Sequence, residues 1–364
     1  MNRITPLRRA TLVIAAAAAG VGSPLGAQED PVVRAFAAEL DSLRVAHGIP
    51  GLSVAVVRDG RVILARGYGW ADVEARRPAT EHTPYNIASV TKPISGVLAM
   101  RLVERGVLDL DRPMSSFANW AEFCAEVRED GPRIFFADYS CAPELTLRHV
   151  MSMQGNGAPG ERFYYNPIVF SWASRPIMQL TGRAFSDLVA EEIFAPAGMT
   201  ASARKHRALP LRADLAAALA MPYHVDSAGA FVRSEEPGPQ GDGAAGGVIS
   251  TAADLARFDV ALDEGRLISE ASKAEMWRPG RSPSGAVLPY GIGWFVKQVD
   301  GRRVVWHTGW WEQAYSALYL KLPDERLTLI LLANSEGLWW GNPLDDATVE
   351  RSPFAAAFLR RFRR

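Results

Sequence analysis

The sequence predicts a mixed α/β sandwich whose antiparallel sheet is built from both ends of the chain. Strand-like runs of apolar residues lie early, within 52–67, and late, within 291–333. The stretch between them, roughly 146–267, follows helical spacing and contains no long strand-like run. We therefore expect helices on the faces of the sheet and a mostly helical region inserted between its halves, with the functional site between the two regions.

The first predicted elements are a helix and a hairpin. Residues 33–46 have a helical pattern, and two strand-like runs follow at 52–57 and 62–67. The pair Asp59-Gly60 separates these runs, and Asp-Gly is typical of the tight turn of a β-hairpin. The chain is therefore expected to begin the sheet here.

The next element is a mostly buried helix predicted over residues 88–105, which Gly106 ends. Its apolar residues at helical spacing are Ile94, Val97, Leu98, Met100, Leu102 and Val103. Ser89 and Lys92 fall in the first turn of this helix.

Later elements have clear boundary signals. Gly182 is expected to end one helix, and Thr251 to Asp254 resembles a capping box at the start of another. Strands are then expected at 291–299, 303–307, 315–322 and 327–333.

The composition fits one large domain. The chain has 364 residues, 48% of them hydrophobic, and 40 acidic against 40 basic side chains, a balance that provides no field for nucleic-acid binding. No linker, charge run or repeat divides it, so we expect one catalytic domain over 28–364. Its sheet regions are expected near 28–87 and 285–364, and its helical region near 88–284.

The segment 1–27 is interpreted as a signal peptide. Three arginines precede an apolar run from Thr11 to Gly22, and small residues lead to a cleavage site after Ala27. The run is short for a bilayer span, and no candidate span follows it. We therefore expect an exported protein, periplasmic or secreted; the general and the twin-arginine routes both fit Arg8-Arg9.

Cys124 and Cys141 are the two cysteines of the chain. In an oxidising compartment they can form a disulfide worth roughly 3 kcal/mol, and the alternative is two buried thiols. We favour the bridge because the segment 125–140 mixes charges, Gly and Pro without periodicity. Neither cysteine has a Cys or His at zinc-ligand spacing, and no metal or other cofactor is implied.

The spacing Ser89-x-x-Lys92 places a hydroxyl and an amine on one face of the predicted helix. A desolvated Lys92 can take the proton of Ser89, and the helix N-terminus favours the developing oxyanion. The spacing alone is weak evidence, because Ser202 and Lys205 share it and precede only a Pro-containing loop. The structural alternative is a serine at a helix start beside a solvated lysine.

Four longer segments support the catalytic interpretation: 49–57, 86–93, 102–111 and 245–258. In this order they resemble the class C β-lactamase-like serine hydrolases, which include class C β-lactamases, D-aminopeptidases, certain carboxylesterases and D,D-peptidases. The resemblance covers nearly all of the mature chain. It implies a β-lactamase/transpeptidase-like fold with Ser89 and Lys92 as catalytic residues.

The resemblance also implies a catalytic tyrosine from a Tyr-x-Asn element, usually reached through Pro-Gly-x-x-Phe-x-Tyr. Here that approach begins at Pro159 and places Tyr165 at the catalytic position. A literal Tyr-x-Asn begins at Tyr164, which remains the second candidate. With Tyr165 in place, Pro167 stands where the family often carries an Asn, and proline cannot donate an amide hydrogen bond to a β-lactam.

The third family element, Lys-Thr-Gly or a variant, corresponds to His307-Thr308-Gly309, which the resemblance implies to bind substrate. It also implies an oxyanion hole formed by the backbone N–H groups of Ser89 and Trp310. Gly309 is expected to let the substrate lie close to the strand edge. His307 removes the permanent cation that would hold a β-lactam carboxylate.

We predict a serine hydrolase that cleaves a small ester, amide or peptide through an acyl-enzyme, of the carboxylesterase or D-amino-acid peptidase type. One alternative is a true β-lactamase or D,D-peptidase, which would need another cation. A second is a catalytically silent relative that binds cell-wall peptides or a protein. Specificity is expected in the loops 117–143 and 335–345. The tryptophans that fit either an apolar acyl pocket or simple packing are Trp310, Trp311, Trp339 and Trp340.

Overall fold

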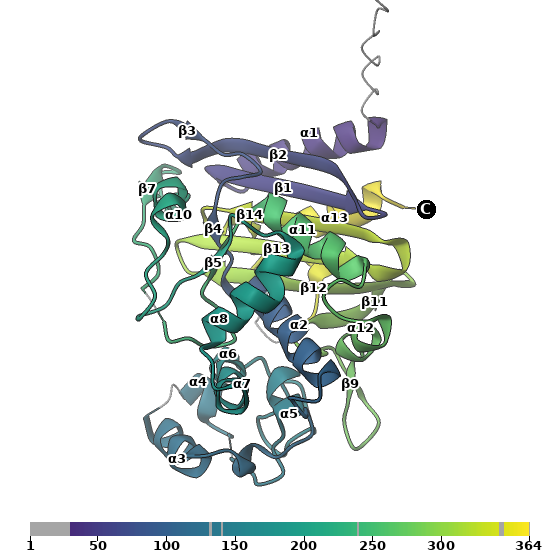
Figure 1. Ribbon diagram of the computed structural model, residues 1–364. Helices are drawn as coiled ribbons and strands as arrows, with labels where there is room; N and C mark the ends of the chain where they lie inside the picture. Colours follow the sequence, from purple (N-terminus) through teal and green to yellow (C-terminus); the bar gives the residue numbers. More distant parts are fainter. Residues whose placement is uncertain (1–29, 131–132, 140, 239, 342–345, 364) are drawn as a thin grey trace, which may run out of the picture.

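An antiparallel sheet from both ends of the chain forms the centre of the computed structural model (Figure 1). Among the described residues, seven strands form it in the order β11-β12-β13-β14-β1-β2-β3. The described residues are 30–130, 133–139, 141–238, 240–341 and 346–363, so the predicted signal peptide 1–27 lies outside them. The strands are β1 (Gly51–Arg58), β2 (Arg61–Asp72), β3 (Arg77–Pro78), β11 (Phe295–Val299), β12 (Arg302–Trp311), β13 (Tyr315–Leu322) and β14 (Leu327–Ala333). The predicted fold class is confirmed.

The turn between β1 and β2 has the predicted form. Asp59 and Gly60 both have positive φ, at 50° and 74°, as a tight two-residue hairpin turn requires. Arg58 and Arg61 pair on either side of it. The strands extend further than the apolar runs predict, because β1 is paired on both sides, with β2 and β14.

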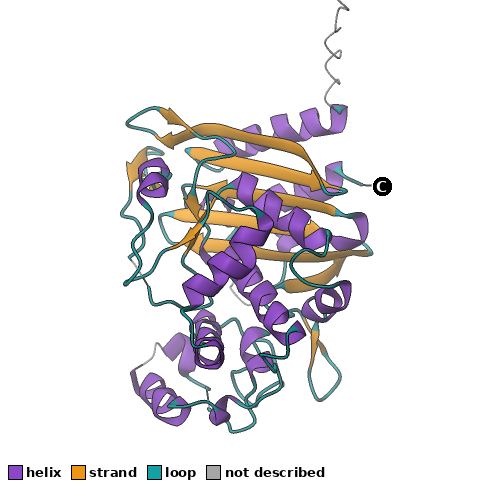
Figure 2. Cartoon of the chain, viewed as in Figure 1, coloured by secondary structure: helices purple, strands orange, loops and turns teal. Residues whose placement is uncertain are grey.

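Helices cover both faces of this sheet, as the secondary-structure view shows (Figure 2). Every residue of β13 and β14 is buried, which requires cover on each face. The helix α11 (Ala252–Asp263) crosses the near face, and α1 (Pro31–Ala46) pairs with α13 (Pro353–Arg361) elsewhere on the sheet.

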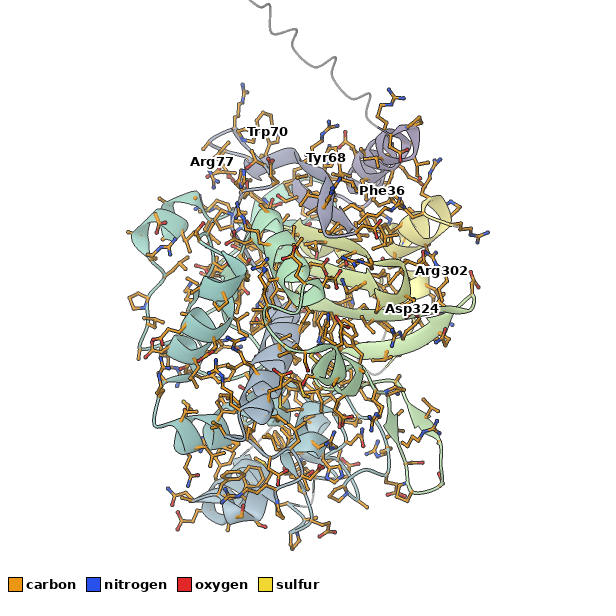
Figure 3. The ribbon with its side chains drawn as sticks, turned by 45° about the vertical axis from the view of Figure 1, so that its right-hand side comes forward. Phe36, Tyr68, Trp70, Arg77, Arg302 and Asp324 are labelled. Carbon is orange, nitrogen blue, oxygen red and sulfur yellow. A yellow bond between two sulfur atoms is a disulfide. The ribbon has the colours of Figure 1, made fainter. Side chains whose placement is uncertain are left out.

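Aromatic contacts hold the two chain ends together. The ring of Phe36 in α1, which Figure 3 labels, lies 5.7 Å from that of Phe358 and 5.3 Å from that of Phe362, two residues of the C-terminal segment. The hydroxyl of Tyr68 in β2 donates to the Ala37 carbonyl of α1 at 2.9 Å. The first helix is thus fixed to both the sheet and the C-terminal helix.

The helical region lies mainly below the sheet in Figure 1, and α2 (Thr91–Glu104) connects the two. Of the 14 residues of α2, 11 are buried, as predicted for this segment. Gly182 ends α7 with φ 66°, and the Thr251 side chain caps α11 by accepting from the Asp254 N–H. The other helices are α3 (Trp120–Asp130), α4 (Arg133–Phe136), α5 (Leu147–Met151), α6 (Pro167–Ser171), α7 (Ser174–Thr181), α8 (Phe185–Val189), α9 (Ala195–Ala197), α10 (Ala213–Ala218) and α12 (Glu270–Met276).

Short strands also occur in and beside the helical region, and the sequence does not predict them. These strands are only two or three residues long, too short for a periodic signal. The small sheet β4-β8-β5 is important for the site because its strand β4 ends shortly before Ser89 in the chain. The short strands are β4 (Tyr85–Asn86), β5 (Ala203–Arg204), β6 (Tyr223–Val225), β7 (Phe231–Arg233), β8 (Val248–Ser250), β9 (Gly280–Arg281) and β10 (Val287–Leu288).

A buried ion cluster joins the sheet to α11. The Lys321 amine lies 3.0 Å from an oxygen of Asp259 and 2.8 Å from one of Asp263, and its side chain is 1% exposed. Asp259 also accepts from Thr328 at 2.9 Å and from the Tyr319 hydroxyl. Burial favours a neutral amine, but the two carboxylates outweigh it and hold the pKa of Lys321 above its ordinary value.

We expect Lys321→Met to destabilise the fold by about 3–5 kcal/mol, because it leaves buried carboxylate without its cation. Urea unfolding followed by circular dichroism measures this loss. Lys297→Met is the matched control, since its ion pair with Glu350 is about one-third exposed and should be worth about 1 kcal/mol or less. Equal losses in the two variants would contradict the assignment.

Candidate active site

Ser89 lies in a 3₁₀ turn, Ala88–Val90, directly before α2, rather than in the first α-helical turn as predicted. The reason is local: Asn86 accepts a hydrogen bond from the Ala88 N–H at 3.0 Å, and Ala88 has φ 47°. The N–H of Ile87 donates to Val248 of β8 at 3.1 Å. The turn that presents Ser89 is therefore held in a strained conformation by its neighbours.

Lys92 reaches back from α2 to this turn. Its Nζ atom lies 2.7 Å from Ser89 Oγ and 3.1 Å from the Ala245 carbonyl oxygen. The side chain is fully buried, and burial holds the pKa of Lys92 well below that of a solvated lysine. A neutral amine beside the hydroxyl can accept its proton, so the geometry suits a general base.

Tyr165 is the tyrosine beside Ser89. It is 6% exposed, Lys92 Nζ lies 5.2 Å from its ring centroid, and its ring stacks on Phe295 at 6.0 Å. Burial raises the pKa of Tyr165, although its hydrogen bond with Ser89 acts in the opposite direction. The hydroxyl therefore stays protonated at neutral pH.

Tyr164 points elsewhere. Its hydroxyl donates to the backbone carbonyl of Ile134, and the Arg162 guanidinium lies 5.1 Å from its ring centroid. It is not among the residues that line the cavity at Ser89, whereas Tyr165 is. The structure thus brings Tyr165, and not Tyr164, together with Ser89 and Lys92.

The asparagine of the literal Tyr-x-Asn is structural. Asn166 is buried, caps α6 by accepting from the Val169 N–H, and donates its amide to the Phe135 carbonyl at 2.9 Å. Pro167 follows it and lines the cavity without any donor. At position 167 the cavity therefore lacks the side-chain amide of the Asn that the family often carries there.

The strand β12 presents alternate residues to the cavity. Trp306, Thr308 and Trp310 line it, whereas His307 and Gly309 do not, because side chains alternate between the faces of a strand. Trp311 lines it as well, at the end of β12 where the strand stops. A Cβ on Gly309 would lie 2.2 Å from the Ile87 carbonyl oxygen. Glycine at this position serves the close approach of β12 to the turn before Ser89, which differs from the expected role in substrate access.

His307 is buried and already has partners. Its Nδ1 lies 2.7 Å from the Thr308 carbonyl, which can only accept, so Nδ1 carries the proton and Nε2 accepts from the Tyr290 hydroxyl at 2.8 Å. Burial holds the pKa of His307 well below its ordinary value, and any positive charge on Lys92 would lower it further. His307 is neutral and offers no cation to a substrate.

The cavity has a volume of about 510 Å³ and is largely aromatic. Ser89 and Trp310, whose backbone amides are the predicted oxyanion hole, both line it. The four tryptophans for which the sequence leaves an acyl pocket and simple packing open also line it. The aromatic lining residues are Phe135, Tyr165, Phe295, Trp306, Trp310, Trp311, Trp339 and Trp340.

The segment between Cys124 and Cys141, which a disulfide closes, contributes one of these aromatic residues. The structure joins Cys124 and Cys141 in a disulfide, with Cα atoms 6.1 Å apart. Between them, Phe135 lines the cavity, and its carbonyl accepts from the amides of Asn156 at 2.8 Å and Asn166 at 2.9 Å. The segment 117–143 is not a simple loop as predicted, because it forms the helices α3 and α4. Phe135 lies in α4, and the sequence has no signal that singles it out.

The second Ser-x-x-Lys, Ser202 to Lys205, does not have the geometry of a catalytic pair. Ser202 bonds to Ser250 and Asp254, both at 2.8 Å, and Lys205 pairs with Glu236 at 2.7 Å. These contacts are structural. Within the described ranges, no group of His, Cys, Asp and Glu could hold a metal ion, and no helix is long and apolar enough to cross a membrane.

An antiparallel sheet beside a helical region, with a serine and a buried lysine at the start of the helix between them, is the arrangement of the β-lactamase-like serine hydrolases. The chain belongs to the Beta-lactamase family, whose model matches residues 32–349. This establishes the family that the sequence motifs predict.

Three relatives illustrate the match. Penicillin-binding protein 4* of Bacillus subtilis (strain 168) is 28% identical over 312 residues, or 78% of this chain and 68% of that protein. The D-aminopeptidase of Brucella ovis is 28% identical over 79% of this chain, which spans only 57% of the length of that enzyme. The structure of D-amino acid amidase from Ochrobactrum anthropi SV3 with D-phenylalanine has a TM-score of 0.71 at 20% identity and covers 92% of this chain and 100% of that one.

We expect the reaction rate of Ser89 with a fluorophosphonate to rise with pH and to level off well below the ordinary pKa of lysine. The reason is that burial lowers the pKa of Lys92, so the neutral base forms at lower pH. Intact-mass kinetics across the pH range measure this profile.

Lys92→Met should slow this labelling by about a hundredfold or more at every pH. Lys205→Met is the matched control and should leave the profile unchanged. A wild-type rate that still rises near pH 10.5 would show that Lys92 titrates like a solvated amine.

Proposed function

We propose that this chain is a serine hydrolase that cleaves an ester or amide through an acyl-enzyme on Ser89. The observation that carries the proposal is the buried Lys92 amine at 2.7 Å from Ser89 Oγ, where both residues line a large aromatic cavity. The family membership supports the same activity.

The proposed mechanism uses four groups. Lys92, with Tyr165, takes the proton of Ser89 while Oγ attacks the carbonyl carbon of the substrate. The backbone N–H groups of Ser89 and Trp310 stabilise the oxyanion. Tyr165 passes the proton to the leaving alcohol or amine as the bond to carbon breaks, and water then hydrolyses the acyl-enzyme.

The substrate type we propose is a small ester, or an amide of the D-amino-acid peptidase type. Two of the reported relatives are a D-aminopeptidase and a D-amino acid amidase, the latter solved with D-phenylalanine. A neutral, buried His307 and a donor-free Pro167 disfavour a β-lactam, whose carboxylate and acylamino group need a cation and an amide.

Export to an oxidising compartment is part of this proposal. The arginines and apolar run within 1–27 support a cleavable signal, and the disulfide between Cys124 and Cys141 is of the kind that persists outside the cytoplasm. Periplasmic and secreted locations both fit.

The proposal is tested by intact-mass analysis after treatment with a fluorophosphonate or a penicillin, together with turnover of p-nitrophenyl acetate and nitrocefin. We expect a fluorophosphonate adduct and ester turnover in wild type and in Ser202→Ala, and neither in Ser89→Ala. Turnover that favours nitrocefin would identify a β-lactamase instead. No Ser89-dependent adduct with either probe would indicate a catalytically silent relative.

The two tyrosines provide a further test. Tyr165→Phe removes the hydroxyl beside Ser89, so we expect kcat for p-nitrophenyl acetate to fall by about a hundredfold or more. Tyr164→Phe removes a hydroxyl that donates to the Ile134 carbonyl and does not line the cavity, so this variant should retain most of the activity. Steady-state kinetics measure both, and the opposite order would assign the role to Tyr164.

A further inference from the structure

The charged side chains that line the cavity are mostly acidic. Glu312 and Asp346 line it, and the basic side chain among its described lining residues is Lys92 alone. Burial favours the neutral form of Lys92, so its amine adds little positive charge at neutral pH. An anionic substrate would therefore meet two carboxylates without a compensating cation.

The two carboxylates are not equivalent. Asp346 has an ion-pair partner, Arg351, at 3.5 Å, which offsets part of its charge. Glu312 is exposed and has no ion-pair partner within the ranges that the structure describes. Glu312 is thus the stronger source of negative potential at the cavity.

Tryptophan rings line the same cavity as these two carboxylates. The ring of Trp339 stacks on Trp310 at 5.6 Å and on Trp340 at 5.5 Å, with interplanar angles of 24° and 29°. The Trp310 indole N–H donates to the Glu336 carboxylate at 3.1 Å, which makes that ring richer in electrons. All three rings line the cavity, and tryptophan faces attract cations.

We propose that Trp310, Trp339 and Trp340, together with Glu312, bind an ammonium group of the substrate. The substrate class is then an ester or amide whose acyl part carries a primary or quaternary ammonium group. This inference rests on the proposed hydrolase function and specifies its substrate. It explains why a large aromatic cavity has acidic rather than basic side chains at its wall.

The test compares two esters of the same shape, p-nitrophenyl 4-(trimethylammonio)butanoate and p-nitrophenyl 5,5-dimethylhexanoate, which differ in one positive charge. Each kcat/KM is divided by the rate of uncatalysed hydrolysis. We expect wild type to favour the cationic ester by about tenfold. The preference should shrink as salt is raised from 0.05 to 0.5 M, because ions screen exposed charges.

Variants connect the preference to the named groups. Glu312→Gln should lower the ratio of the two kcat/KM values about threefold, and Trp339→Leu should lower it further. Trp339→Phe keeps an aromatic face and should restore part of the ratio. Asp300→Asn removes one exposed carboxylate in the turn between β11 and β12, where Asn tolerates the positive φ, and should leave the ratio unchanged.

Binding without turnover keeps this inference separate from the hydrolase proposal. Tryptophan fluorescence is titrated with choline and with its neutral analogue 3,3-dimethyl-1-butanol, and we expect choline to bind more tightly and Glu312→Gln to weaken it. Loss of hydrolysis of both esters with retained choline preference would overturn the hydrolase function alone. Equal binding of the two alcohols, or equal effects of Glu312→Gln and Asp300→Asn, would overturn the ammonium site.

Discussion

The buried amine of Lys92 is the constraint on which the site depends. An ammonium group with no carboxylate partner is costly in a low-dielectric environment, so burial favours its neutral form. The Lys92 amine forms hydrogen bonds with the Ala245 carbonyl and with Ser89 Oγ, and aromatic rings lie next to it. The same burial that is expensive for stability makes Lys92 a base for its neighbour.

The fold provides this burial by bringing three distant segments to one place. The helix α2 carries Lys92, the strand β8 and the residues before it supply Ala245 and hold Ile87, and β12 closes the other side. Gly309 is the point of closest approach, because any side chain there would overlap the Ile87 carbonyl. The sheet from both chain ends therefore serves the site directly, by placing β12 beside the turn before Ser89.

The same arrangement determines what the cavity can bind. Alternation along β12 directs Trp306 and Trp310 to the cavity and turns His307 toward Tyr290, where it is neutral. The disulfide-closed segment adds Phe135, whose backbone is fixed by Asn156 and Asn166. The result is an aromatic cavity without a permanent cation among its described lining residues.

The sequence by itself determined the class of fold, the Asp59-Gly60 hairpin, the buried helix after Ser89 and the family, because periodicity, turn chemistry and ordered motifs are local properties of the chain. It favoured Ser89 over Ser202 from the apolar helix that follows, and Tyr165 over Tyr164 from the family motif, but it could not show which side chains meet, because that depends on distant segments of the chain. Tertiary structure placed Tyr165 against Ser89 and tied Tyr164 to Ile134. It also assigned Gly309 to packing and Phe135 to the cavity, since both roles depend on contacts between segments far apart in sequence.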